Sequence, residues 1–214
     1  ELTVADVYLA GAWKTVLVGT KGRGTPGVFA LDVTDPVNPR FLWEVSGSTV
    51  SALGNNIGKP IIAQVANGQW RVLLGNGPNG SGNTAQLIML NVSNGSATVV
   101  TTSEAGSEGL SAIQAWDSDQ DGFTDTAYAG DFEGNLWRFS ALGGTPVAAK
   151  LFSAVDSGGD PQPITAAPLA ARNPLTSETW VFFGTGRYLS EGDLSDDSVN
   201  TWYGLRDLGA TITG

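Results

Sequence analysis

The segment Asp117–Asp125 has the residue types and spacing of a metal-binding loop. Aspartates stand at its first, third, fifth and ninth positions, and a glycine stands at the sixth. Ca²⁺ takes about six to eight oxygen ligands, and alternating carboxylates followed by a glycine that permits a sharp bend are typical of calcium loops. We predict a Ca²⁺ site whose ligands are the side chains of Asp117, Asp119, Asp121 and Asp125 and the backbone carbonyl of Phe123. Metal is expected to order this loop, because without a cation the carboxylates repel one another.

The loop departs from an EF-hand, which has a bidentate Glu at its twelfth position and a helix on each side. Here the twelfth position is Tyr128. The flanking segments 111–116 and 126–129 are short, apolar and β-favouring, so we place the loop between two strands. The alternative interpretation is an acidic surface turn without an ion, since Asp and Gly are common turn formers.

The composition narrows the chemistry that is available. The chain has 214 residues, of which 29 are Gly and 15% are charged, and this mixture suits many strands joined by tight turns. It contains no Cys and no His. Disulfides, Ser/His/Asp and Cys/His catalytic arrangements and most transition-metal sites are therefore excluded, and oxygen-ligand chemistry remains.

The charge of the chain also narrows the list of partners. The net charge is −10 and the sequence pI is near 4.2, so binding to nucleic acid or to an anionic membrane surface is not expected. Apolar runs fall far short of the roughly 20 residues of a membrane-spanning helix, so no spanning segment is expected. We take the chain as a mature protein or an excised domain whose export signal lies outside it.

A repeat of glycine-ended β segments organises the chain. The glycines Gly19, Gly75, Gly130 and Gly184 each close an apolar run and are spaced 56, 55 and 54 residues apart. Each is preceded by a first predicted strand, at 3–9, 59–63, 110–116 and 164–169, and is followed by further apolar strands. This pattern predicts an all-β fold, a β-propeller of about four visible blades that is part of a larger ring. The approximate blades are 1–50, 51–106, 107–160 and 161–214, within a single propeller domain.

Other features are interpreted structurally. The acidic segment 191–197 is predicted to be a solvated turn, with weak cation binding as the alternative, because its carboxylates do not alternate. Asp131 is expected to bind the backbone of its own turn rather than the metal. The small residues at the repeat glycines fit places where backbones crowd together. Six of the seven Trp fall in predicted strands, where packing between blades is expected, and Trp13 lies in a turn and is expected to be exposed.

With the loop and the repeat identified, the segment 116–139 resembles the C-terminal propeller of the PilC/PilY family of type IV pilus tip and biogenesis proteins. Weaker support comes from 29–33, 43–45 and 181–188. The resemblance implies a non-enzymatic adhesin or biogenesis protein in which calcium at the loop is linked to pilus extension and retraction, and so to twitching motility and surface attachment. It implies export through the periplasm to the cell surface or pilus tip. The implied partners are minor pilins or the tip complex, a host surface, and the remainder of a larger propeller chain.

Two other protein classes remain open. A quinoprotein-type dehydrogenase propeller also uses calcium, and the segment 129–137 is similar to the Trp-docking motif of those enzymes. Only one clear copy is present, and their metal bridges to a cofactor. A generic calcium-binding adhesion propeller would carry acidic loops in several blades, whereas this sequence has one.

Overall fold

The computed structural model describes residues 1–56 and 58–212, and they form four antiparallel sheets. The first sheet contains β1 (Leu2–Leu9), β2 (Ala12–Thr20), β3 (Gly27–Asp32) and β4 (Arg40–Ser46). The second contains β5 (Ile61–Ala66), β6 (Gln69–Gly75), β7 (Thr84–Asn91) and β8 (Ala97–Ala105). The third contains β9 (Leu110–Trp116), β10 (Thr126–Asp131), β11 (Asn135–Ser140) and β12 (Val147–Ser153). The fourth contains β13 (Leu169–Arg172), β14 (Thr179–Gly184) and β15 (Trp202–Asp207), with the 3₁₀ helix η1 (Glu191–Ser195) between the last two.

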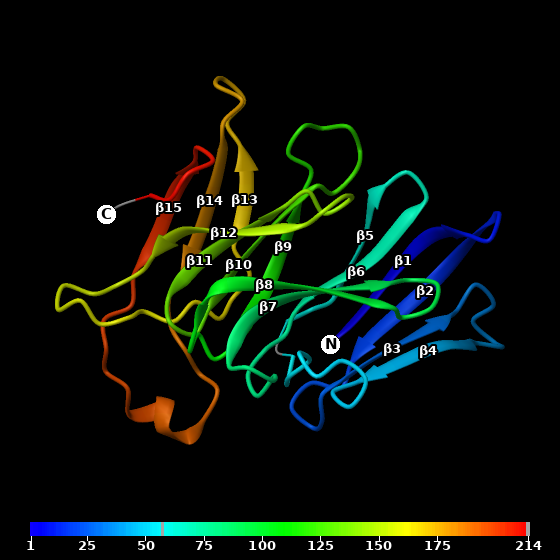
Figure 1. The fold of residues 1–214 in the computed structure, drawn as a ribbon, viewed down its shortest axis with the longest axis horizontal. Helices are drawn as coiled ribbons and strands as arrows, with labels where there is room; N and C mark the ends of the chain where they lie inside the picture. Colours follow the sequence, from blue (N-terminus) through cyan, green and yellow to red (C-terminus); the bar gives the residue numbers. More distant parts are fainter. Residues whose placement is uncertain (57, 213–214) are drawn as a thin grey trace.

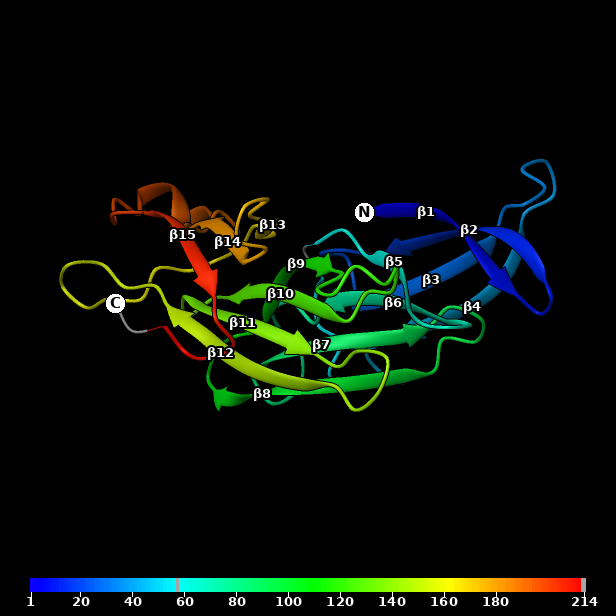
Figure 2. The ribbon, with the colours of Figure 1, turned by 90° about the horizontal axis from the view of Figure 1, so that it is seen from above.

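The sheets follow one another along an arc (Figure 1). Figure 2 shows the first strands of the sheets, β1, β5, β9 and β13, along one side of this arc, with the outer strands β8 and β12 along the other. Each sheet meanders from its first strand to its last, so every neighbour in the sheet is also a neighbour in sequence. The predicted all-β propeller is confirmed.

The hydrophobic cores lie between consecutive sheets. On β6, Val72 and Leu74 pack in the core shared with the first sheet, whereas Leu73 packs in the core shared with the third. Successive side chains of a strand point to opposite faces, so a central sheet that is covered on both sides needs apolar residues at consecutive positions. The continuous apolar runs of the sequence follow from this requirement.

The repeat glycines mark places of close approach. A Cβ atom at Gly75 would lie 2.1 Å from the Ser111 carbonyl oxygen of the third sheet, and one at Gly130 would lie 2.2 Å from the Ile164 side chain. At Gly184 the nearest neighbouring atom would be 3.8 Å away. The expected crowding is therefore present at Gly75 and Gly130, where another sheet or the chain leading to it follows, and at Gly19, where an added Cβ would lie 2.5 Å from the Phe29 ring of its own sheet. It is absent at the end of the arc.

The fourth sheet differs from the prediction. The predicted strand 164–169 is not formed: Ile164 makes a single parallel bridge with Gly186, and β13 starts only at Leu169. Pro168 lies in the predicted strand and has no N–H to donate to a sheet ladder. Beyond β15 the chain returns to the third sheet, where the Ile212 amide donates to the Leu151 carbonyl at 2.6 Å.

The two end faces of the arc expose large apolar side chains. Leu2, Val4 and Phe41 of the first sheet are 57%, 54% and 67% exposed. On the fourth sheet, the ring of Phe182 stacks between those of Trp180 and Trp202. Faces of this kind pack against further blades in a propeller ring.

The exposure of the tryptophans depends on whether another sheet covers the face on which they lie. Trp43 and Trp137 are buried as expected, and the expected exposure of Trp13 is confirmed. Trp202 is 70% exposed, contrary to the expectation of packing between blades, because no described blade covers its face.

Candidate metal centre

Three carboxylates converge in the loop between β9 and β10. Asp117, Asp119 and Asp125 each place an oxygen atom within 4.8 Å of the others, which is close enough for one cation to contact all three. Asp121 stands outside this group, and its carboxylate accepts the Phe123 amide at 2.8 Å. The structure thus brings together three of the four predicted carboxylate ligands.

Backbone amides hold the loop in this shape. The Asp117 carboxylate accepts the amides of Gln120 at 2.6 Å and Gly122 at 2.9 Å. The chain bends between them with φ angles of 66° at Gln120 and 92° at Gly122, and the second of these favours glycine. The glycine at the sixth position therefore turns the chain around its first carboxylate.

The charges of the loop favour a cation. Desolvation raises the pKa of Asp117, but hydrogen bonds within the loop, chiefly from the amides of Gly122 and Gln120, together outweigh it and the net pKa is lowered. The Asp121 amide lowers the pKa of Asp119, yet desolvation and the neighbouring carboxylates outweigh that contribution and the net pKa is raised. Among the described residues, no Lys or Arg forms a salt bridge with the three convergent carboxylates. Clustered oxygen donors without a cationic partner fit a hard divalent ion such as Ca²⁺.

The loop is tied to the two neighbouring sheets as well as to its own. Asp125 accepts the Ser118 hydroxyl at 2.7 Å, and the Ser118 carbonyl in turn accepts the Arg172 guanidinium from β13. On the other side, the Thr124 amide donates to the carbonyl of Gln64 on β5 at 2.8 Å. The loop therefore joins the second, third and fourth sheets.

Asp131 belongs to a separate, buried arrangement. It is fully buried, and its carboxylate accepts the Trp137 indole N–H and the Asn135 amide, each at 2.8 Å, and the Glu133 amide at 3.0 Å. Burial raises its pKa against these hydrogen bonds. The expectation that Asp131 binds its own turn is confirmed.

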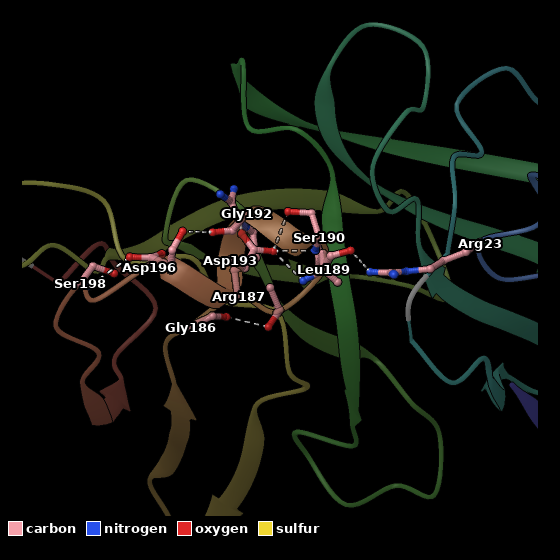
Figure 3. Close-up of polar contacts among 11 residues, drawn as sticks. Arg23, Gly186, Arg187, Leu189, Ser190, Gly192, Asp193, Asp196 and Ser198 are labelled. Atoms are coloured by element: carbon pink, nitrogen blue, oxygen red, sulfur yellow. Dashed lines mark hydrogen bonds and ion pairs between the residues drawn. The ribbon is translucent and has the colours of Figure 1, made fainter.

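The acidic segment 191–197 is not a solvated turn at its centre. Figure 3 shows Asp193 surrounded by donors of its own loop: the amides of Leu189 and Ser190, each at 2.7 Å, and the Arg187 guanidinium at 3.0 Å. The Asp193 side chain is only 4% exposed. Arg23 reaches from the loop after β2 to the Leu189 carbonyl. Because the Asp193 carboxylate is already bound by donors of its own loop, hydrogen bonds organise the segment between β14 and β15.

This arrangement predicts the acid sensitivity of the loop. The amides of Leu189 and Ser190 lower the pKa of Asp193 from 3.8 to about 2. A depressed pKa in the folded state stabilises the fold above the ordinary pKa, and this contribution is lost as the pH falls through the lower value. We expect the Leu189 and Ser190 amides to stay protected from hydrogen exchange at pH 4 and to lose protection as the pH approaches 2. Asp193→Asn should lose most of that protection already at pH 4, and equal protection of the variant would contradict the role given to Asp193.

Several residues of the site carry no signal in the sequence. Arg172 contacts the loop across 54 residues of chain, and Gln64 contributes only its backbone. Ser118 lies inside the predicted loop, but its hydroxyl contact with Asp125 depends on the fold of the turn. Neither residue type nor spacing identifies these neighbours.

The fold and the site together define a class: a β-propeller, described over four blades, with a candidate oxygen-ligand metal loop on one blade. The family model of the PilY1 β-propeller domain matches residues 2–149 and 144–212. The chain belongs to this family.

Relatives and a solved structure agree with that assignment. The chain is 49% identical over 215 residues to a type IV pilus biogenesis factor PilY1 homolog of Xylella fastidiosa, covering 100% of this chain and 18% of that protein. It is 39% identical over 232 residues to type IV pilus biogenesis factor PilY1 of Pseudomonas aeruginosa, covering 95% of this chain and 20% of that protein. The crystal structure of the P. aeruginosa PilY1 C-terminal domain superimposes with a TM-score of 0.90 at 36% identity, covering 99% of this chain and 51% of that domain. The arc thus corresponds to about half of that crystallised domain.

The described residues contain no helix that is long and apolar enough to cross a membrane.

Proposed function

We propose that this chain is the calcium-binding part of the propeller of a type IV pilus biogenesis and tip adhesin protein. In this proposal the protein acts outside the cell, at the surface or the pilus tip, after export through the periplasm. It contacts minor pilins or the tip complex, and a host surface, and has no enzymatic activity. Calcium occupancy regulates pilus extension and retraction, and with them twitching motility and surface attachment.

The observation that carries this proposal is the convergence of Asp117, Asp119 and Asp125 in a loop that is tied to two neighbouring blades. The backbone carbonyl of Phe123 and the Asp121 side chain complete the proposed ligand set. A bound cation neutralises the carboxylates and fixes the loop, and the loop in turn contacts Arg172 and Gln64. An ion regulates two functional states only if they bind it with different affinity, and contacts between blades can supply that difference.

The alternative classes fit less well. The interpretation as a dehydrogenase depends on a Trp-docking motif. In the structure, the Trp137–Asp131 hydrogen bond joins β11 to the end of β10 within a single blade. The three convergent carboxylates all come from one loop. A generic adhesion propeller would repeat the acidic loop, and Asp117, Asp119 and Asp125 form the one such carboxylate group among the described residues.

The proposal is tested in bacteria that carry the longer protein. Asp125→Ala in that protein should leave it exported but make surface motility insensitive to calcium chelation. Asp193→Ala, in the other acidic loop, is the matched control and should keep the calcium response of the parent. Normal, calcium-dependent motility of the Asp125→Ala strain would contradict the regulatory role.

The contact between Arg172 and Ser118 leads to a further prediction. Arg172 also donates to the Ser177 carbonyl at 3.2 Å, so it connects the metal loop with the hairpin that follows β13. Calcium should therefore slow hydrogen exchange in 173–178 as well as in the loop itself. Arg172→Gln should weaken calcium binding by about 100-fold at most, the upper end of the usual effect of a residue beyond the ligands, while the response of 173–178 disappears.

The control for this prediction is Arg206→Gln on β15, which pairs with Glu178 at 2.9 Å and, among the described residues, forms no hydrogen bond or ion pair with the metal loop. It should leave calcium-dependent protection of 173–178 in place. Protection that is independent of calcium in the parent would show that the hairpin does not respond to the metal.

A further inference from the structure

Trp13 presents an aromatic face to solvent while its position is held by other rings. It is 64% exposed at the start of β2. Its ring meets Tyr8 edge to face at a centroid distance of 5.6 Å and Trp70 of the second sheet at 6.3 Å. Edge-to-face pairs are favourable beyond the area they bury, so they restrain the indole without covering it.

A pocket adjoins this ring. Its remaining walls come from the β1–β2 hairpin and the loop between β3 and β4, and the lining residues are Ala12, Trp13, Lys14, Asp32, Thr34, Asp35, Asn38 and Arg40. Lys14 pairs with Asp32 at 2.5 Å, and the Asp32 side chain is only 7% exposed. This pair forms a fixed polar base to the pocket.

The rim groups are set in place for hydrogen bonding. Asp35 accepts the Val37 amide at 3.1 Å and the Asn38 side-chain amide at 2.9 Å, which orient its carboxylate. The Arg40 guanidinium, in contrast, has no hydrogen bond or salt bridge to any described side chain or backbone group. A ligand therefore meets an oriented acceptor at Asp35 and an uncommitted planar donor at Arg40.

The charges and shape of the pocket select the ligand. The two cations of the pocket, Lys14 and Arg40, balance its two anions, Asp32 and Asp35. The pocket therefore has no net attraction for a polyanion, and the chain as a whole has a net charge of −10. Neighbouring hydroxyls of a sugar can donate a hydrogen bond to a carboxylate and accept one from an adjacent guanidinium. The C–H face of a pyranose ring can pack against an exposed indole. Small-molecule sites combine apolar surface with a few placed polar groups in this way. We propose that this pocket is a binding site for a neutral saccharide, with one pyranose ring stacked on Trp13 and its hydroxyls bound by Asp35 and Arg40.

The polar base of the pocket lies away from the uncovered end face of the arc, and the Trp13 ring is held beside the second sheet by its contact with Trp70. Asp32 is paired in register with Val16, and Val16 is buried in the core between the first and second sheets. Lys14 is two residues before Val16 on the same strand, so Lys14 and Asp32 share the face that looks toward the second sheet. A further blade on the outer face of the first sheet would leave this side of the pocket open.

The test uses cellohexaose, maltohexaose and mannohexaose as neutral probes and polygalacturonate as the charged one, with binding followed by calorimetry and by Trp fluorescence. At least one neutral probe should bind saturably, with a dissociation constant of about 1 mM. Trp13→Ala should weaken that binding by at least about ten-fold, and Asp35→Asn and Arg40→Gln each by a similar factor, since ten-fold corresponds to about 1.4 kcal/mol.

Trp202→Ala is the matched control, because Trp202 is a similarly exposed indole on the fourth sheet, and the variant should bind within about two-fold of the parent. Circular dichroism confirms that each variant is folded, and Trp13→Phe, which keeps an aromatic face, should recover part of the binding. Absence of binding by all three neutral probes, binding of polygalacturonate alone, or equal losses in Trp13→Ala and Trp202→Ala would each overturn the proposal. If the longer protein failed to bind the neutral probe that this chain binds, the proposal would be overturned as well.

Discussion

Asp125→Ala is expected to reduce calcium affinity by at least about 100-fold, because it removes a ligand and a support of the loop at once. Its carboxylate is one of the three convergent groups. The same carboxylate accepts the Ser118 amide at 3.2 Å and its hydroxyl at 2.7 Å, and these bonds hold the start of the loop to its end. Calorimetry on chelator-stripped protein measures the effect directly.

The loss should also appear in thermal stability. A ligand at about one hundred times its dissociation constant stabilises the folded state by about 2.7 kcal/mol. For a domain of about this size that raises the Tm by about 5 to 10 °C. The parent should show this shift on addition of calcium, whereas at the same calcium concentration Asp125→Ala should gain about 0.4 kcal/mol at most, a shift of about 2 °C or less.

Two further variants separate the roles of Asp125. Asp125→Asn keeps an oxygen acceptor for Ser118 but loses the charge, so it should fold like the parent and still bind calcium weakly. Asp193→Ala alters the other acidic loop and should leave the calorimetric titration unchanged. Retention of one full calcium site in Asp125→Ala would show that the metal, if bound, lies elsewhere.

The second large effect concerns packing between blades. Gly75→Ala is expected to lower the free energy of unfolding by about 3 kcal/mol, the upper part of the usual range for an overfilled core. The added Cβ would lie 2.1 Å from the Ser111 carbonyl oxygen and 2.5 Å from that of Leu110. Both contacts are backbone atoms, so relief requires the second and third sheets to move apart.

The repeat supplies a matched control at its last glycine. Gly184 occupies the equivalent position in the fourth sheet, but its nearest neighbour would be 3.8 Å from an added Cβ. Gly184→Ala should therefore change stability by less than about 0.5 kcal/mol or stabilise the strand slightly, because glycine in a strand costs conformational entropy. Urea denaturation of both variants measures the difference, and equal losses would exclude a role for contact between sheets.

The sequence by itself determined the features that depend on short stretches of chain. Alternating aspartates and one glycine within nine residues specify an acidic turn whose amides fold back on its carboxylates, since every partner lies within the loop. The spacing of Gly19, Gly75, Gly130 and Gly184 likewise specified repeated blades, because a repeated local pattern folds into a repeated local unit.

Only the tertiary structure decided which groups meet across the blades. Arg172 and Gln64 reach the metal loop from the fourth and the second sheet. Trp13 lies beside a pocket whose opposite wall comes from the loop between β3 and β4. Such contacts join residues far apart in the chain, and they depend on how twisted sheets stack, which residue type and spacing do not encode locally.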